Sequence, residues 1–324
     1  MESSSLASRL VSALTNAIKP AFTTLRFLVL VMLPVSLVVM LLDASGVLAI
    51  ISHWLDPVMH FLGLPGQASL VFISSISLNL YSAIAVIGRL DLSPREVAIL
   101  ASMCLLAHSL IIECAIMKRT GTSFAKTVFM RIFAALASAW ILNKILPPSF
   151  GPRFGTHASE LVPALNLSLS NLPNLFFTWF KDSGILVIKL TVIIYALMIV
   201  QKFLEEFKLL DLLAKVLYPI VAFFGLPRST SFLWIVANVI GLAYGSAVLI
   251  EQTDSEKIPI QDANLLNHHL ALSHSLLEDS ILFVLMGVPI VLIILPRLAF
   301  AFAAAWLERL RRWWLLKTFK VGIL

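Results

Sequence analysis

The residues of this chain best suited to chemistry are ionisable groups that interrupt otherwise apolar segments. Six of them form two sets with one spacing, 166 residues apart: His108, Glu113 and Arg131, and His274, Asp279 and Arg297. An unpaired ionisable group inside a bilayer costs several kcal/mol, so such groups mark functional sites by default. The sequence therefore predicts one polar site to which both sets contribute.

Several kinds of chemistry suit these side chains. Imidazoles titrate near neutral pH and could relay protons. Together with carboxylates they could bind a divalent cation such as iron, zinc or manganese. Against a metal, there is no compact H-E-x-x-H motif, and the adjacent His268 and His269 face different directions. The alternatives are a purely structural hydrogen bond between the two histidines and arginines that snorkel to the membrane interface. Whether a metal is bound stays open.

Further polar residues surround the two histidines in the sequence. Ser109 and Ser275 directly follow His108 and His274. In the second set Asn267, His274 and Glu278 have spacings that place them on one helix face. We therefore add these neighbours to the predicted substrate-binding residues.

Composition decides the class of protein. Hydrophobic residues make up 59% and charged residues only 13% of the 324 residues, and the mean hydropathy is +0.95. Soluble chains are about 25% charged, so the sequence predicts a polytopic helical membrane protein. The net charge of +6 comes from short loops and the C-terminus, as the positive-inside rule expects. Lipid is therefore the expected partner, and nucleic acid is not.

An enzymatic role has little support in the sequence. It contains no G-x-S-x-G, Walker, H-E-x-x-H or G-x-G-x-x-G motif. Its two cysteines, Cys104 and Cys114, have no metal-binding or redox spacing. We expect no catalysis, no cofactor and no ATP-driven step within this chain.

An internal repeat organises the chain. Phe61-Leu62-Gly63-Leu64-Pro65 returns as Phe223-Phe224-Gly225-Leu226-Pro227, and His108-Ser109-Leu110 returns as His274-Ser275-Leu276. The second register holds for more than 30 residues, which predicts two homologous halves, 20–146 and 182–310. Structural or gating roles are expected for Gly63, Pro65, Gly225 and Pro227 and for the two arginines.

Each half fits one membrane topology. The predicted order is a span, an amphipathic interfacial stretch, the Gly-Leu-Pro turn, a re-entrant hairpin and two more spans. In the first half the spans are 25–43, 95–117 and 123–146, and the interfacial stretch is 47–62. The hairpins, 66–88 and 229–250, are rich in small and polar residues, among them Asn79, Ser82, Asn238 and Ser246. Such irregular backbone survives at membrane depth only beside protein or a water-filled cavity.

Charge bias supports that topology. Three crossings per half make the second half inverted relative to the first. With both termini in the cytoplasm, seventeen of the 24 Lys and Arg residues lie inside. The predicted fold is thus all-α, a polytopic protein of two inverted repeats in a bacterial inner membrane. An amphipathic lead, 1–19, a linker, 147–181, and a basic interfacial segment, 311–324, complete it.

The Gly-Leu-Pro turns, polar hairpins and His-Ser-Leu spans resemble the Gate, or nucleoside-recognition, domain family. That family includes the gate segments of concentrative nucleoside transporters and of the ferrous-iron transporter FeoB, and the spore maturation membrane proteins. The resemblance implies an inverted-repeat transport core with substrate held between hairpins and broken helices. It places the four polar hairpin residues beside the histidines and acids. The G-protein of FeoB and the extra scaffold helices of nucleoside transporters are absent, so the domain name alone does not assign nucleosides.

The functional prediction is a secondary transporter or permease. Its solute would be small and polar, like a nucleoside, or a divalent cation, like ferrous iron, with coupling to an ion or proton gradient. So short a core is expected to work as a homo-oligomer. The alternative is a non-transporting scaffold or assembly subunit whose polar pairs only lock the halves together. A transporter needs a hydrated path to His108 and His274, whereas a scaffold keeps them dry.

Overall fold

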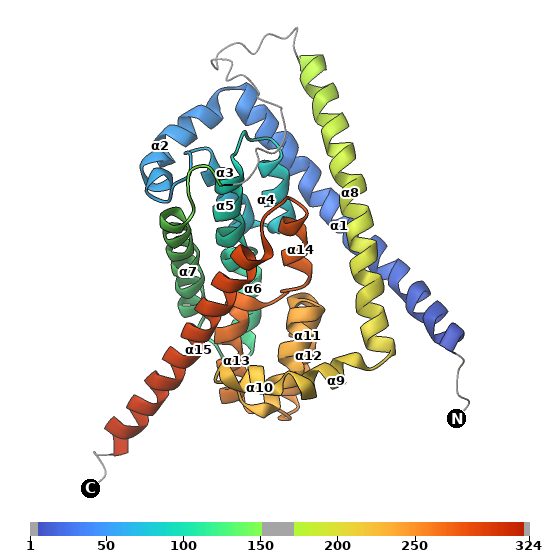
Figure 1. Cartoon of the computed structure of the whole chain (residues 1–324), viewed down its shortest axis with the longest axis vertical. Coiled ribbons are helices and arrows are strands. Elements are labelled where there is room, and N and C mark those ends of the chain that lie inside the picture. Colours follow the sequence, from blue (N-terminus) through green and yellow to red (C-terminus); the bar gives the residue numbers. More distant parts are fainter. Residues whose placement is uncertain (1–5, 151–171, 321–324) are drawn as a thin grey trace. The chain divides into compact units, whose positions relative to one another are not determined.

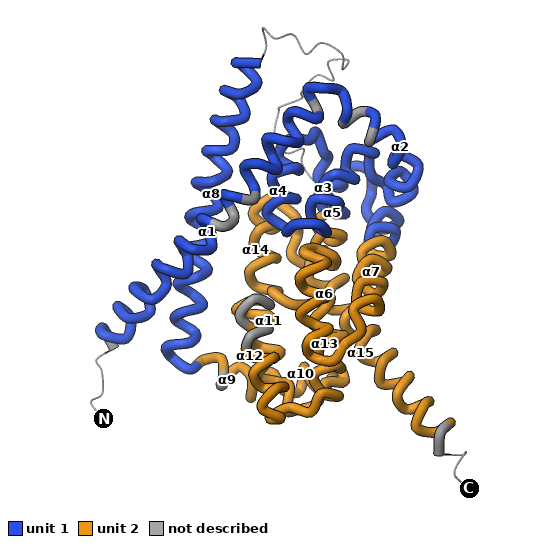
Figure 2. Tube along the Cα trace, turned by 180° about the vertical axis from the view of Figure 1, so that it is seen from behind, with its two compact units in different colours: residues 1–100, 139–208 blue, residues 101–138, 209–324 orange. Residues whose placement is uncertain are grey.

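The computed structural model describes residues 6–150 and 172–320, and within those residues it is helical without strands. The predicted all-α class is therefore confirmed. The chain forms two compact units, residues 1–100 with 139–208 and residues 101–138 with 209–324 (Figure 2). Two of the three unit boundaries fall within α5 (Pro94–Ala107) and α7 (Phe124–Ile145), and the third lies between residues 208 and 209. Both predicted halves thus contribute residues to both units.

Unit 1 is organised by two long helices. α1 (Leu6–Ala44) packs along α8 (Leu172–Glu206) (Figure 1). Ala13, Ala17 and Ala21 are buried on α1 at a spacing of four residues, which lets two helices approach closely. Over the residues that the structure describes, the predicted lead, 1–19, and the apolar stretch that follows it form one continuous helix. The part of the predicted linker that the structure describes beyond residue 171 belongs to α8.

The first predicted hairpin is a pair of short helices in unit 1. α2 (Val47–Phe61) precedes it, where an interfacial helix is expected, and α3 (Ala68–Ser77) packs against α4 (Leu80–Ile87). At ~1.5 Å per residue neither α3 nor α4 could cross a core ~30 Å thick. Asn79 caps α4, because its Oδ1 accepts a hydrogen bond from the Ser82 backbone N–H at 2.9 Å. These lengths suit a re-entrant segment.

The two Gly-Leu-Pro turns have the same local conformation. Gly63 and Gly225 have φ angles of 77° and 76°, a region that glycine enters without steric cost. The Gly63 carbonyl accepts a hydrogen bond from Arg95 at 3.2 Å, and the Gly225 carbonyl accepts one from Arg309 at 2.8 Å. The sequence repeat is therefore also a repeat of backbone geometry.

Unit 2 contains the remaining helices. In chain order they are the second part of α5, α6 (Leu110–Arg119), the first part of α7, α9 (Leu209–Val216), α10 (Tyr218–Phe223), η1 (Arg228–Thr230), α11 (Ser231–Val239), α12 (Leu242–Asp254), α13 (Ile260–Ser273), α14 (Glu278–Val284) and α15 (Ile290–Lys320). α13 lies at the centre and packs against α15, α11 and α6. Ten of its fourteen residues are buried. The buried polar residues of the sequence motif lie around this central helix.

Four helical segments are long and apolar enough to cross a membrane: Pro94–Arg119, Phe124–Ile145, Leu172–Glu206 and Ile290–Thr318. They match four of the six predicted spans. The span at 25–43, within α1, and the middle span of the second half stay predictions. α15 runs without interruption into the basic C-terminal residues up to Lys320, so the part of 311–324 that the structure describes is not a separate helix.

Candidate functional site

Two broken helices define the candidate site in unit 2. α5 ends at Ala107 and α6 begins at Leu110, while α13 ends at Ser273 and α14 begins at Glu278. Each break contains a histidine followed by a serine in the left-handed region, with φ of 45° at Ser109 and 53° at Ser275. For a residue with a β-carbon this conformation costs roughly 1–2 kcal/mol. Such strain persists where the surrounding structure imposes it, often at functional sites.

The two histidines face each other across the breaks. His108 Nδ1 donates to the Cys104 carbonyl at 3.1 Å, and His274 Nδ1 donates to the Leu270 carbonyl at 2.7 Å. Each ring is thereby anchored to its own helix one turn earlier. The two Nε2 atoms lie 3.1 Å apart.

Two carboxylates complete the inner part of the site. Glu113 places Oε1 3.2 Å from His108 Nε2 and Oε2 3.3 Å from His274 Nε2. Asp279 Oδ2 lies 3.6 Å from His108 Nε2. All four side chains are buried, with residue exposures between 1% and 8%. The histidines and Asp279 are close enough to ligate one metal ion, because their ligand atoms all lie within 4.8 Å of one another.

Each arginine binds the helix end of its own repeat. Arg131 Nε donates to the Leu106 carbonyl at 3.0 Å, and Arg297 Nε donates to the Leu272 carbonyl at 3.4 Å, with 25 residues between donor and acceptor in both cases. Both arginines are 0% exposed. The snorkelling interpretation is therefore wrong for both.

The arginines also pair with the acids. Arg131 Nη1 lies 2.5 Å from Glu113 Oε2, whereas Arg297 Nη2 lies 3.5 Å from Asp279 Oδ2 and also donates to the His274 carbonyl. Two guanidinium groups thus face two carboxylates, so the cluster is balanced in charge when the histidines are neutral. We call these six residues the buried cluster.

The helix breaks explain where the charges lie. A broken helix exposes backbone carbonyls at its C-terminal end and backbone N–H groups at its N-terminal start. The arginines contact the carbonyl ends of α5 and α13, and the acids occupy the first turns of α6 and α14. Cations at C-termini and anions at N-termini are favoured by the helix dipole. Breaking both helices therefore stabilises the ionised side chains in a buried site.

The segments that carry the two breaks run antiparallel. His108 lies beside His274. Thr120 and Thr122, which follow His108 in the chain, accept hydrogen bonds at 2.8 and 3.0 Å from Nδ2 of Asn267, which precedes His274. As residue numbers rise on one helix they fall on its partner. Asn267 and His274 therefore both contact the α6 segment, Asn267 at the turn between α6 and α7.

The predicted shared face of His274 and Glu278 is not formed. α13 ends at Ser273, so the spacing of four residues spans the break rather than one helical turn. Glu278 lies instead beside Gly241, where a β-carbon would be 3.3 Å from both Glu278 Oε2 and Ser275 Oγ.

The second predicted hairpin meets the second break. The Ser275 and Leu277 N–H groups donate to the carbonyls of Ala237 and Asn238 at 2.8 and 3.1 Å. The Asn238 side chain donates to the Trp234 carbonyl at 2.8 Å, and its Oδ1 is buried without a hydrogen-bond partner. The segment predicted as the second hairpin thus lies against the broken helix within unit 2.

Other predicted residues lie elsewhere or outside the description. Asn79 and Ser82 belong to unit 1, where they bond to each other across the first turn of α4. Ser246 lies in α12, and its side chain is outside the described part of the structure. Pro65 and Pro227 are the last residues of the two Gly-Leu-Pro turns, and their carbonyls accept hydrogen bonds from the backbone N–H groups of Ala68 and Thr230.

Sequence reasoning missed one polar cluster. The Glu308 carboxylate, with a side chain 1% exposed, pairs with Lys126 at 2.6 Å and with Arg311 and Arg312 at 2.8 and 2.9 Å. The sequence does contain a signal for this cluster, because Glu308 is the sole acid among the basic residues near the C-terminus. This cluster joins α7 to α15 within unit 2.

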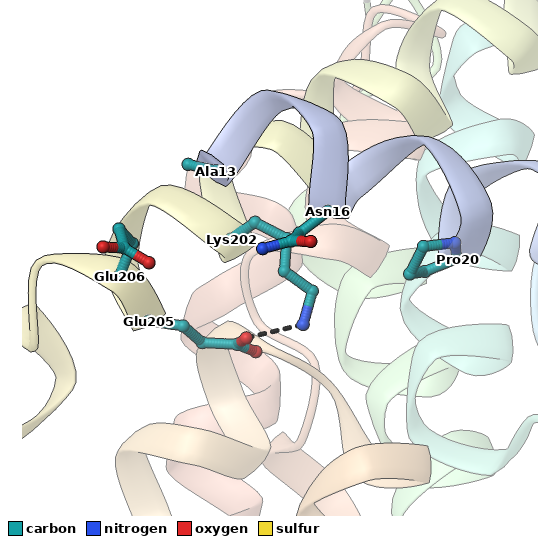
Figure 3. A pocket seen from close by; sticks show the side chains of 6 residues that line it. All are labelled: Ala13, Asn16, Pro20, Lys202, Glu205 and Glu206. Carbon is teal, nitrogen blue, oxygen red and sulfur yellow. Dashed lines mark hydrogen bonds and ion pairs between the residues drawn. The ribbon is translucent and has the colours of Figure 1, made fainter. Parts of the chain in front are cut away.

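Two open hollows occur in unit 1. One, of about 440 Å³, lies between α1 and α8 and is lined partly by Lys202 and Glu205, which pair at 2.6 Å (Figure 3). The other, of about 470 Å³, borders the first Gly-Leu-Pro turn and includes Gly63, Pro65 and Arg95. Neither is lined by a residue of the buried cluster.

The fold and the site together define the class of this protein. It is an all-helical membrane protein with two broken helices and a buried polar cluster. Residues 24–124 match the family described as Gate, nucleoside recognition. The chain is also 30% identical over 273 residues to the uncharacterized membrane protein YvoD of Bacillus subtilis (strain 168), covering 84% of this chain and 86% of that protein. The chain belongs to the Gate family. No solved structure matches it.

Proposed function

We propose that this protein is a secondary transporter or permease that moves a small polar solute or a divalent cation across the membrane. The observation that carries the proposal is the buried cluster at the two helix breaks. Transporters of the inverted-repeat type build their solute and ion sites from interrupted helices near the bilayer midplane. Coupling to a proton or ion gradient suits a site that contains two imidazoles.

The proposed topology has two inverted halves in a bacterial inner membrane, with both termini cytoplasmic. The antiparallel course of α6 and α13 supports inversion, because equivalent helices of inverted halves cross the membrane in opposite directions. The short helix pairs α3–α4 and α11–α12 support two re-entrant hairpins. Four apolar segments of spanning length support the membrane location.

A scaffold or assembly subunit is the second candidate function. The observation in its favour is the pairing of the charges: each arginine of the buried cluster has an acid partner, and no member is more than 8% exposed. A dry, balanced cluster could serve only to hold α6, α13 and α15 together. Flux measurements separate the two candidates.

The test is solute uptake by liposomes that contain the purified full chain. Nucleosides, ferrous iron and manganese are offered separately, with and without a pH gradient. We expect uptake of one of these solutes, abolished by Glu113→Gln, Asp279→Asn, His108→Ala and His274→Ala. His60→Ala, at an exposed position of α2, is the matched control and should transport normally.

Two outcomes would count against the proposal. Absence of any uptake by correctly folded protein would favour the scaffold. Normal uptake by the four cluster variants would place the transport site elsewhere in the chain.

A further inference from the structure

The inner atoms of the buried cluster are all hydrogen-bond acceptors. A backbone carbonyl can only accept, so His108 Nδ1 and His274 Nδ1 must carry the protons that they share with Cys104 and Leu270. A neutral imidazole then has only a lone pair at Nε2. The two Nε2 atoms nevertheless lie 3.1 Å apart. Two lone pairs face each other at this distance only if a positive species lies between them.

The carboxylates strengthen this requirement. Glu113 presents one oxygen to each histidine, and Asp279 presents one to His108. Ionised carboxylates are also acceptors only. The guanidinium groups donate to the helix ends through Nε and pair with the carboxylates through Nη, so their contacts go to carbonyls and acids and not to the two histidine Nε2 atoms. Two imidazole nitrogens and two carboxylates therefore converge, and among the described residues the donors beside them are the two arginines, which contact the carboxylates.

The spacing of these atoms fits a coordinated metal ion. Ligands at ~2.0–2.1 Å from an ion in tetrahedral geometry are ~3.3–3.4 Å from one another. The observed separations are 3.1 Å between the imidazoles, 3.2 and 3.3 Å from Glu113 to His108 and His274, and 3.6 Å from Asp279 to His108. The two imidazoles and Asp279 have ligand atoms that all lie within 4.8 Å of one another, and Glu113 places a different oxygen near each histidine.

The surrounding hydrogen bonds are those of a metal site. Histidines that bind metal donate their other ring N–H to a carbonyl or carboxylate, which fixes the tautomer and the ring orientation. Both cluster histidines do this through Nδ1. Each carboxylate is held in turn by an arginine. The outer groups thus orient all four inner ligands.

We propose that His108, His274, Glu113 and Asp279 bind a divalent first-row transition-metal ion. Two imidazoles with two carboxylates suit zinc, iron or manganese, whereas calcium and magnesium prefer ligands that are all oxygen. That this ion is the transported solute rests on the proposed function, whereas the binding site rests on the geometry alone. The arginines already balance the carboxylates, so the ion adds net charge and binds more weakly than a structural zinc. Weak binding suits release.

Metal binding is tested on the full chain purified in detergent and treated with a chelator. Co²⁺ is titrated in and followed by visible absorption, which reports its coordination, and Zn²⁺ and Mn²⁺ are titrated by calorimetry. We expect one ion per chain. His108→Ala and His274→Ala should each weaken binding by ~100-fold or more, since loss of outer partners alone costs 10–100-fold.

Matched variants separate ligand loss from unfolding. His269→Ala removes an equally buried histidine of α13, whose Nδ1 bonds to Ser273 at 2.8 Å outside the cluster, and should bind Co²⁺ as the wild type does. Glu113→Gln should weaken binding more than Asp279→Asn, because Glu113 contacts both histidines. If an alanine variant does not fold, His108→Gln and His274→Gln keep a polar side chain there and should show the same loss.

The outcomes distinguish this inference from the proposed function. Folded wild type that binds no ion, or histidine variants that bind as well as His269→Ala, would overturn the metal site. Nucleoside uptake without metal binding would support the transporter and contradict the metal site. Binding of one ion per chain without any solute flux would support the metal site and contradict the proposed transport function.

Discussion

The two helix breaks of unit 2 share a backbone plan and differ in how tightly their charges pair. At both breaks, the histidine donates a hydrogen bond to its own helix. In both, an arginine donates to a backbone carbonyl at the end of that helix, and the arginine lies 25 residues after the carbonyl. At the first break Arg131 lies 2.5 Å from Glu113, whereas at the second Arg297 lies 3.5 Å from Asp279. The second break is also longer, because four residues separate Ser273 from Glu278 and two separate Ala107 from Leu110.

This difference gives the two carboxylates different roles: Glu113 holds the site together, and Asp279 is freer to move. Glu113 contacts Arg131 and both histidines, so the first break fixes the centre of the cluster. Asp279 is one methylene shorter than Glu113, contacts one histidine and is farther from its arginine. Asp279 is therefore the carboxylate with more freedom to change partners, as the proposed cation site would require.

The largest effect should follow removal of Arg131. Arg131→Met leaves the Glu113 carboxylate buried without a cation, and breaking a buried ion pair by removal of one partner costs about 3–5 kcal/mol. Arg297→Met should cost less, about 1.5–3 kcal/mol, the range for hydrogen bonds by a charged donor, because its acid is 3.5 Å away. The free energy of unfolding in mixed micelles measures both.

Two further variants test the cause. Arg119→Met removes an exposed pair with Asp254 and should change stability by about 0–1 kcal/mol. The double change Arg131→Met with Glu113→Gln should recover part of the loss, since no unpaired charge remains. Equal losses at Arg131 and Arg297 would contradict the difference between the breaks.

The sequence predicted the outline of the fold because apolar runs and turn residues are local signals. The span expected at 123–146 is α7, Phe124–Ile145, and the interfacial stretch at 47–62 is α2, Val47–Phe61. The pairing of His108 with His274 followed from the repeat register, because residues equivalent in two copies tend to meet at the seam between them. The inverted arrangement itself stays a prediction.

The helix breaks could not be predicted in the same way. The residues around His108 and His274 include no proline or glycine between 104 and 114 or between 270 and 280, so the apolar pattern is continuous there. The left-handed serines are imposed by packing and by the arginine contacts, which come from other helices. The acceptors of those arginines are backbone carbonyls, which side-chain patterns do not reveal. For the same reason His274 and Glu278 were wrongly placed on one helical face.

The Gly-Leu-Pro turns extend the comparison with a smaller effect. Alanine at a positive φ costs roughly 1–2 kcal/mol, so both Gly63→Ala and Gly225→Ala should destabilise. Gly63→Ala should cost more, because its β-carbon would lie 2.1 Å from Asn143 Oδ1, against 3.0 Å from Arg309 Cδ at Gly225. Asn143 cannot easily move, since Arg95 donates to it at 2.6 Å. Thermal unfolding in detergent measures the order.

Gly184→Ala is the control for these turns. Gly184 lies within α8, and a β-carbon there would meet nothing within 4 Å. Alanine should therefore leave stability unchanged or raise it by up to about 1 kcal/mol, the difference in helix propensity. A loss at Gly184 similar to that at Gly63 would show that the turns are not the cause.

The smallest effect concerns the serines, where the two breaks should behave alike. Glycine and alanine variants of Ser109 both lack the hydroxyl, so their difference isolates the β-carbon. At a left-handed position glycine should be more stable than alanine by about 0.5–1 kcal/mol, because relief of ~1–2 kcal/mol of strain exceeds the entropy cost of glycine. The same sign is expected at Ser275.

Ser138, within α7, supplies the matched position in an unbroken helix, and there alanine should be the more stable by about 0.5–1 kcal/mol. The reversal of sign between Ser138 and Ser109 is the decisive measurement, since it does not depend on the size of the hydroxyl contribution. If the alanine variant is more stable than the glycine variant at Ser275 but not at Ser109, the longer second break relieves the backbone strain at its serine. In that case the strain belongs to the first copy alone, which is also the copy with the tighter ion pair.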